Sequence, residues 1–181
     1  MTVSLVYETH ALTEDNETGH ATGWLPGKLS EQGRLLAAEL GERRRNDGID
    51  MVFSSDLARA AETAQVAFGG SGILVLHDWR LRECNYGELN GMPVAKLREV
   101  HSQHVDIPYP GGQSYRDVVD VTRSFLSDLL TFFDGKRVCV IAHAANKRAL
   151  DVLLLGANLE DAVRADLGWR EGWEYTLAWP T

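Results

Sequence analysis

The sequence predicts an α/β fold: one domain with a mostly parallel sheet and helices on both of its faces. Three observations support this prediction. Short apolar segments typical of buried strands alternate with longer segments of helical periodicity. The 181 residues are enough for one domain and few for two. No internal repeat, low-complexity stretch or linker-like segment divides residues 1–181, which we expect to fold as a single unit.

The individual elements follow from apolar runs, periodicity and capping residues. The first strand, residues 3–7, is short and rich in valine and leucine. Residues 8–28 are polar and glycine-rich, which predicts a long loop, and residues 78–113 are expected to form an irregular insertion over the active edge of the sheet. Further strands are expected at 50–54, 73–77, 137–142 and 174–179. Helices are expected at 31–45 after the N-cap Ser30, from Asp56 to about 68, at 93–100, from Ser114 to about 133, and at 144–155.

Composition and charge exclude several functional classes. The net charge of −8 argues against nucleic-acid binding, which usually needs a basic surface. No apolar run approaches the length of about 18 residues that spans a membrane, and the first residues do not resemble a secretory signal. The two cysteines lack metal-ligand spacing, and neither His101 nor His104 has an evident third ligand, so we predict no metal site. We therefore expect a cytoplasmic protein.

Two histidines lie just past the ends of predicted strands, His10 after the first strand and His143 after residues 137–142. In an open α/β sheet, ligands bind at the carboxyl ends of the strands, so two distant strand ends can contribute to one pocket. Arg59 follows another strand end, and Glu83 lies in the segment after the third strand. Two imidazoles, a guanidinium and a carboxyl group are a set that could transfer a phosphoryl group through a histidine.

At this point the residues resemble the histidine phosphatase superfamily, also called phosphoglycerate mutase-like proteins. Each motif alone is weak, but five of them occur in the order of the family between residues 3 and 155. The motifs are Thr9-His10-Ala11 with Thr13 and Asn16; Ser54-Ser55-Asp56-Leu57 with Arg59 and Thr63; Leu81-Arg82-Glu83 with Tyr86 and Gly87; Pro110-Gly111-Gly112-Gln113-Ser114; and Ala142-His143-Ala144 with Arg148. The resemblance implies the phosphoglycerate mutase-like fold and a reaction that needs no cofactor.

The resemblance also implies a role for each residue. His10 is the nucleophile, with its other ring nitrogen held by a backbone carbonyl. Glu83 is the general acid that protonates the leaving alcohol. The phosphate oxygens are bound by Arg59 and by His143, which we expect to be an imidazolium. Asn16 and the backbone near Thr22 and Gly23 are further candidates for phosphate binding.

Thr9 is the main departure from the family, whose members have a phosphate-binding arginine at this position. A bidentate arginine makes two charge-assisted hydrogen bonds, so its uncompensated loss should weaken phosphate binding by at least about tenfold. We hypothesise that another cation replaces it. Lys147, one turn into the helix after His143, is the first candidate, and Arg82 is the second.

The function that this reading favours is hydrolysis of a small phosphorylated substrate through a phosphohistidine, with inorganic phosphate as product. One alternative is a weak or inactive family member that binds phosphorylated ligands or partners, an alternative that Thr9 favours. Another is phosphoglycerate mutase-type transfer, which a chain of 181 residues disfavours because it has little room for a cover over the intermediate. A phosphoprotein substrate stays open, since small family members include such enzymes. The sequence determines neither the substrate nor the oligomeric state.

Overall fold

The computed structural model describes residues 1–168 and 170–178. Its five strands form one sheet in the order β3-β2-β4-β1-β5. β1 is parallel to β4, and β2 is parallel to both β4 and β3, whereas β5 is antiparallel to β1. The strands are β1 (Thr2–Thr9), β2 (Met51–Ser54), β3 (Leu74–His77), β4 (Arg137–Ala142) and β5 (Trp173–Ala178). The mostly parallel sheet predicted from the sequence is confirmed.

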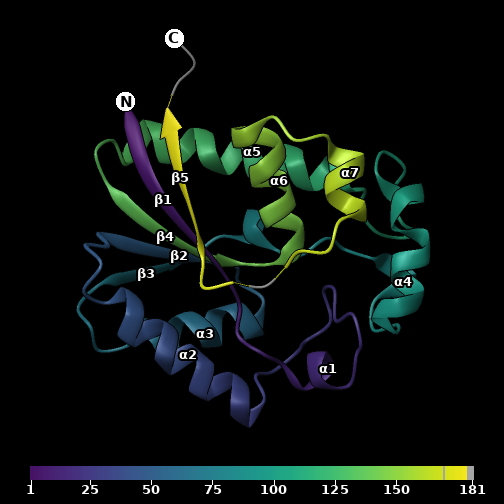
Figure 1. Cartoon of the computed structure of the whole chain (residues 1–181), viewed down its shortest axis with the longest axis horizontal. Helices are drawn as coiled ribbons and strands as arrows, with labels where there is room; N and C mark the ends of the chain where they lie inside the picture. Colours follow the sequence, from purple (N-terminus) through teal and green to yellow (C-terminus); the bar gives the residue numbers. More distant parts are fainter. Residues whose placement is uncertain (169, 179–181) are drawn as a thin grey trace.

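Helices cover both faces of this sheet, as predicted (Figure 1). α2 and α3 lie on one face, while α5 and α6 lie on the other. The helices are α1 (Glu14–Glu17), α2 (Glu31–Arg44), α3 (Ala58–Phe68), α4 (Val94–Val100), α5 (Tyr115–Phe132), α6 (Ala144–Leu155) and α7 (Leu159–Arg164). Short 3₁₀ turns occur at Trp79–Leu81, Gly87–Leu89 and His101–His104.

The alternation of side chains along β1 divides the core into two layers. Leu5 and Tyr7 pack in the cluster that includes Phe125 and Leu129 of α5. Val6, on the opposite side of the strand, packs in a cluster with residues of α2 and α3. Because successive strand residues point to opposite faces, one short apolar run supplies both layers.

Two of the predicted helix starts are confirmed by their caps. Ser30 accepts a hydrogen bond from the backbone nitrogen of Gly33 at the start of α2. Ser114 and Asp117 form a reciprocal capping box at the start of α5.

The predicted cap by Asp56 is wrong. α3 begins at Ala58, and its N-cap residue Leu57 makes no side-chain capping bond. The Asp56 carboxylate instead receives two hydrogen bonds from Arg82, at 2.7 and 2.6 Å. This paired contact engages both carboxylate oxygens, so it competes with the single bond that a cap would make.

Other elements differ in extent from the predictions. β1 continues to Thr9, and the predicted loop 8–28 contains α1, which is capped by Thr13. α7, capped by Asn158, was not predicted, because six residues are too few for a clear helical period. The last strand begins at Trp173, and residue 179 of the predicted range lies outside the described residues.

A glycine allows α2 and α3 to pack closely. A Cβ added at Gly41 of α2 would lie 2.3 Å from the carbonyl oxygen of Ala67 in α3. Arg45, just after α2, donates to the same carbonyl at 2.6 Å. Close backbone approach and this bond together fix the distance between the two helices.

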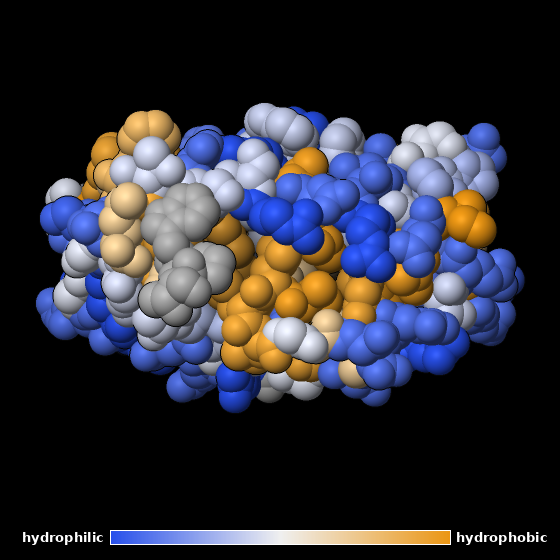
Figure 2. Space-filling model, turned by 90° about the horizontal axis from the view of Figure 1, so that it is seen from above, coloured by the Kyte–Doolittle hydropathy of each residue, from blue (hydrophilic) through white to orange (hydrophobic). Residues whose placement is uncertain are grey.

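The face of the molecule seen from above carries a broad apolar area bordered by hydrophilic side chains (Figure 2). The exposed large apolar residues include Leu155, the last residue of α6. His143 immediately precedes the other end of α6, so Leu155 lies far from the strand ends that carry the predicted site. Within the described residues, no helix combines the length and hydropathy needed to cross a membrane.

Candidate active site

The carboxyl ends of β1 and β4 bring His10 and His143 together, as predicted. The backbone nitrogen of His10 donates to the carbonyl of Ala142 at 2.9 Å, which aligns the two strand ends. The two imidazole rings lie 5.0 Å apart, centroid to centroid. A cavity of about 550 Å³ opens at this edge of the sheet and is lined by His10, Arg59 and Glu83 among others.

The His10 ring is held in one tautomer by its neighbour. Its Nδ1 lies 2.7 Å from the carbonyl oxygen of Ala11. A carbonyl can only accept, so Nδ1 carries the proton and Nε2 carries the lone pair. Burial, and secondarily the charge of Arg59, lower the pKa of His10 to about 3. At neutral pH the imidazole is therefore uncharged and suited to nucleophilic attack, and the expected backbone contact is present.

His143 is completely buried and differs in charge from the expectation. Burial, with the nearby Arg59 and His10, lowers its pKa well below the usual value for histidine. The ring is thus neutral in the ligand-free site, and not the imidazolium that we expected. Among the described residues, neither ring nitrogen has a hydrogen-bond partner. The hydroxyl of Tyr7 donates to the His143 carbonyl and holds the backbone at the start of α6.

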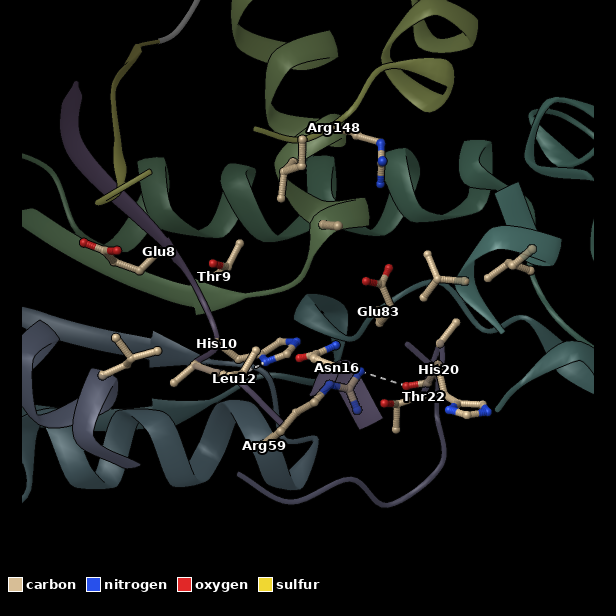
Figure 3. Close-up of a pocket in the computed structure, with 18 of the residues that line it drawn as sticks. Glu8, Thr9, His10, Leu12, Asn16, His20, Thr22, Arg59, Glu83 and Arg148 are labelled. Atoms are coloured by element: carbon tan, nitrogen blue, oxygen red, sulfur yellow. Dashed lines mark hydrogen bonds between the residues drawn. The ribbon is translucent and has the colours of Figure 1, made fainter. Parts of the chain in front are cut away.

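Arg59 brings a positive charge into the buried end of the cavity. It lies in the first turn of α3 and is 2% exposed. Its Nη2 donates to the Gly23 carbonyl at 2.8 Å, and its Nη1 has no partner among the described residues (Figure 3). A buried guanidinium with an unused donor is suited to bind an anion.

Thr63 connects α3 to the segment that follows His10. Its hydroxyl donates to the carbonyl of Arg59 at 2.7 Å and accepts from the backbone nitrogen of Ala11 at 3.0 Å. The sequence motif contained Thr63, but its role in joining these two segments was not predicted.

Glu83 is 8% exposed and lines the cavity across from His10 and Arg59 (Figure 3). Its Oε1 accepts hydrogen bonds from the backbone nitrogens of Cys84, at 2.8 Å, and Ala145, at 3.3 Å. Trp24 donates from its indole nitrogen to the Glu83 carbonyl at 2.6 Å. Hydrogen bonds thus hold both the side chain and the backbone of Glu83 in place.

Asn16, in α1, and Gly23, on the loop that follows this helix, both line the cavity. Asn16 uses its amide oxygen to accept from the backbone nitrogen of Thr13, at 3.2 Å, which leaves its NH₂ group as a donor. Gly23 has a φ of 55°, and an added Cβ would lie 1.8 Å from Oδ1 of Asn90. The close approach of the Asn90 side chain therefore requires glycine, whose carbonyl then receives Arg59.

Neither candidate for the replacement cation behaves as hypothesised. The ammonium of Lys147 pairs with Asp151 and lies 5.1 Å from the centre of the Trp173 ring, and Lys147 is not among the residues that line the cavity. Arg82 pairs with Asp56 and lies over the ring of Trp24. Thr9 does line the cavity, and in this structure neither cation takes the place of the family arginine.

Two histidines outside the motifs border the cavity. His20 lies on the loop and His101 follows α4, and both line its wall. No sequence motif marked them.

The described residues contain no group of three side chains placed to hold a metal ion. In the C-terminal segment, Trp173 is buried against Tyr7, and Trp169 lies outside the described residues.

Comparison with known proteins agrees with this geometry. Residues 9–169 match the model of the histidine phosphatase superfamily, branch 1. A 2,3-bisphosphoglycerate-dependent phosphoglycerate mutase of Mesorhizobium japonicum is 33% identical, over 93% of this chain and 89% of the mutase. Phosphoserine phosphatase 1 of Hydrogenobacter thermophilus is 27% identical, over 87% of this chain and 78% of the phosphatase.

A solved structure shows the same fold. Mycobacterial glucosyl-3-phosphoglycerate phosphatase superposes with a TM-score of 0.78 and 26% identity, covering 90% of this chain and 84% of the phosphatase. That enzyme has also been solved in complex with VO₃ and with inorganic phosphate. With its sheet, its paired histidines and the match across most of its length, this chain belongs to the histidine phosphatase superfamily.

Proposed function

We propose that the protein is a phosphatase that hydrolyses a small phosphate monoester through a phosphohistidine at His10. The observation that carries this proposal is the buried set of unused hydrogen-bonding groups beside a neutral nucleophile. Nη1 of Arg59 and both ring nitrogens of His143 lack partners within the described structure. A phosphoryl group has three equatorial oxygens, and donors placed around them stabilise the charge of the transition state.

In the first step, Nε2 of His10 attacks phosphorus and the bond from phosphorus to the alcohol oxygen breaks. Glu83 gives its proton to that oxygen, so that a neutral alcohol leaves. In the second step, the Glu83 carboxylate takes a proton from water, and the water oxygen attacks phosphorus. The phosphorus–nitrogen bond breaks, which releases inorganic phosphate and restores neutral His10.

Because both histidines are neutral in the free protein, the proposal predicts how the charge of His143 changes when the substrate binds. A phosphate dianion next to His143 favours the charged imidazole and raises its pKa. His143 then donates to the dianion as an imidazolium, the form expected from the sequence. Binding of the ester and uptake of a proton by His143 are coupled in this scheme.

The test is hydrolysis of 4-nitrophenyl phosphate and of an alkyl phosphate in the presence of EDTA by the wild type, His10→Ala and Glu83→Gln. We expect His10→Ala to be inactive toward both. Glu83→Gln should lose about 10²–10⁴-fold in rate toward the alkyl ester and much less toward 4-nitrophenyl phosphate, because nitrophenolate leaves without a proton. Activity retained by His10→Ala, or lost on chelation, would contradict a metal-independent phosphohistidine mechanism.

Phosphoglycerate mutase activity is the second candidate, and the mutase relative from Mesorhizobium japonicum favours it. Chain length does not separate the two functions as we expected, since this chain covers 89% of that mutase. Interconversion of 3- and 2-phosphoglycerate in the presence of 2,3-bisphosphoglycerate, followed by NMR, tests it directly.

Thr9 favours a third candidate, a weak or inactive member that binds phosphorylated ligands. Phosphate binding without turnover of any ester would support that candidate.

A further inference from the structure

The cavity is larger than a phosphate group needs. Its volume of about 550 Å³ falls in the range of about 300–1,000 Å³ that is typical of pockets for drug-sized ligands. The groups proposed to act on phosphate occupy its buried end, around His10 and Arg59. The remaining space is available to the alcohol part of the ester, so the wall there bears on which alcohol is accepted.

The direction of the alcohol follows from the chemistry. In phosphoryl transfer the attacking and leaving atoms lie roughly in line through phosphorus. The leaving oxygen therefore lies on the side away from His10, where Glu83 can protonate it. In Figure 3 the loop with His20 and Thr22 lies on that side.

One face of α4 lines this part of the cavity. Val94, Leu97, Arg98 and His101 all line it, at spacings of three, four and seven residues from Val94. This is the spacing of side chains on a single helical face. We use the name leaving-group wall for these four residues together with Tyr86 and Ala21, which line the same cavity.

The inner part of the wall is apolar and rigidly backed. Leu97 is 1% exposed and packs in a buried cluster with Tyr86, Tyr109 and Tyr115. Val94 is half-buried and starts the helix. A preformed apolar surface favours an apolar ligand because little has to be reordered on binding.

Of the basic groups along the wall, Arg98 and Arg148 keep their charge and have partners within the protein, and His101 is uncharged. Arg98 pairs with Asp166 at 3.0 Å on the exposed rim. Arg148 donates to the carbonyl of Ala162 at 2.9 Å. Burial, with Arg148 and Arg98 nearby, lowers the pKa of His101 to about 4, so its ring is neutral at physiological pH.

We propose that the leaving-group wall favours phosphate esters of alcohols with an apolar body, aromatic or branched alkyl. This inference rests on the proposed function, because it assigns the alcohol side of the same site. It makes Val94 a determinant of specificity: the side chain contacts the alcohol and leaves the phosphate-binding groups unaffected.

Phosphonates test the wall without requiring turnover. Methylphosphonate reports on the phosphate-binding end alone, 3-phenylpropylphosphonate adds an apolar tail, and 2-carboxyethylphosphonate adds a carboxylate. By calorimetric titration, the phenyl compound should bind to the wild type at least about tenfold more tightly than methylphosphonate. The carboxylate compound should gain less than the phenyl compound. If it binds more tightly than the phenyl compound, the inference is wrong.

The variant Val94→Asp and its control Ala95→Asp test whether the tighter binding of the phenyl compound depends on the side chain at position 94. Both place an aspartate in the first turn of α4, but Ala95 is exposed and does not line the cavity. Val94→Asp should abolish the advantage of the phenyl tail and keep the affinity for methylphosphonate, whereas Ala95→Asp should match the wild type. A phenyl advantage that survives Val94→Asp overturns the inference. If methylphosphonate itself does not bind to the wild type, the proposed phosphate site fails, and the inference fails with it.

Discussion

At the scale of single residues, the structure bears on whether another cation replaces the arginine that the family has at the position of Thr9. The sequence suggested that another cation replaces the family arginine, yet Lys147 is paired with Asp151 and Arg82 with Asp56. Arg59 has an unused buried donor in the described site, whereas Arg43, which also lines the cavity and has a buried Nε without a partner among the described residues, is paired with Glu8. In the proposed mechanism phosphate is bound by Arg59, two histidines and uncharged donors such as Asn16, so we expect weaker phosphate binding than in a site with two arginines.

The substitution Thr9→Arg should therefore strengthen the binding of inorganic phosphate by about tenfold, since an added bidentate arginine contributes two charge-assisted hydrogen bonds. Isothermal titration of phosphate into the purified variant measures this. Lys147→Ala serves as the matched test of the original hypothesis and should leave phosphate affinity unchanged. A tenfold loss in Lys147→Ala would instead show that this lysine reaches the anion.

The clustering of the proposed catalytic residues could be predicted because their positions are tied to strand ends and to short motifs. His10, Arg59, Glu83 and His143 lie at one edge of the sheet, as expected. The protonation of His143 could not be predicted, because it depends on burial and on the proximity of Arg59, which arise only in the fold. The ion pairs of Lys147 and Arg82 likewise depend on partners that the sequence pattern does not identify.

At the scale of elements, the spacing between helices depends on single contacts. Gly41 lets α2 approach the Ala67 carbonyl of α3. Replacement by alanine improves the intrinsic helix propensity by about 1 kcal/mol, but it forces a methyl group into backbone atoms that cannot easily move. We expect the steric cost to exceed the gain in helix propensity.

The variant Gly41→Ala should lower the free energy of unfolding by about 1–3 kcal/mol, as overpacked cores do. Urea denaturation followed by circular dichroism measures the change. Glu42→Ala, at the exposed neighbouring position, is the control and should stay within about 0.5 kcal/mol of the wild type. If Gly41→Ala is as stable as the control, the helices can separate without cost.

Helices with a clear capping residue and a regular apolar period were predicted well. Helices that lack these sequence signals were missed or misplaced. The long helix α5 could be predicted from its N-cap residue Ser114 and from its regular apolar face. α1 and α7 have four and six residues, too few to show a period. The start of α3 was misplaced because Asp56 has a partner, Arg82, that is distant in sequence.

At the scale of the whole molecule, a buried ion-pair network connects elements from both halves of the chain. Glu8 of β1, 4% exposed in its side chain, is paired with Arg44 of α2 at 2.7 Å. Arg44 also pairs with Asp47, and Asp47 in turn pairs with Arg137 of β4. The carboxylate of Glu8 depends on these cations, since an unpaired buried charge is costly.

Removing one partner should therefore cost more than removing both. Arg44→Met should lower the free energy of unfolding by about 3–5 kcal/mol because it leaves Glu8 buried without its main cation. The double variant Glu8→Leu with Arg44→Met should recover much of this loss. Chemical denaturation of the two variants gives the comparison, and equal stability of both would show that Glu8 is not held by Arg44.

The buried histidines make stability depend on pH in a defined direction. The pKa of His10 is about 3 and that of His101 about 4 in the folded protein, whereas an unfolded histidine has a pKa near 6.5. Below about pH 6.5 the unfolded chain binds more protons than the folded one, so stability falls as the pH falls toward these folded values.

The midpoint of urea unfolding should thus be lower at about pH 5 than at about pH 7, and His10→Phe should reduce this difference. Inorganic phosphate should also reduce it, because the bound anion favours a protonated His143. Identical midpoints at the two pH values in the wild type would contradict neutral buried rings.

Backbone hydrogen bonds join the loop between α1 and α2 to α4 and the residues just before it. Ala21 and Met92 are linked by a hydrogen bond of 2.8 Å, Gly91 donates to the Ala21 carbonyl at 2.7 Å, and Val94 donates to Gly19 at 2.9 Å. A change in the length of the loop would disturb α4, and a shift of α4 would disturb the loop. We therefore expect exchanges of side chains on α4 to change the substrate preference while the fold of the site is kept, whereas insertions at this junction should disturb the loop and the helix together.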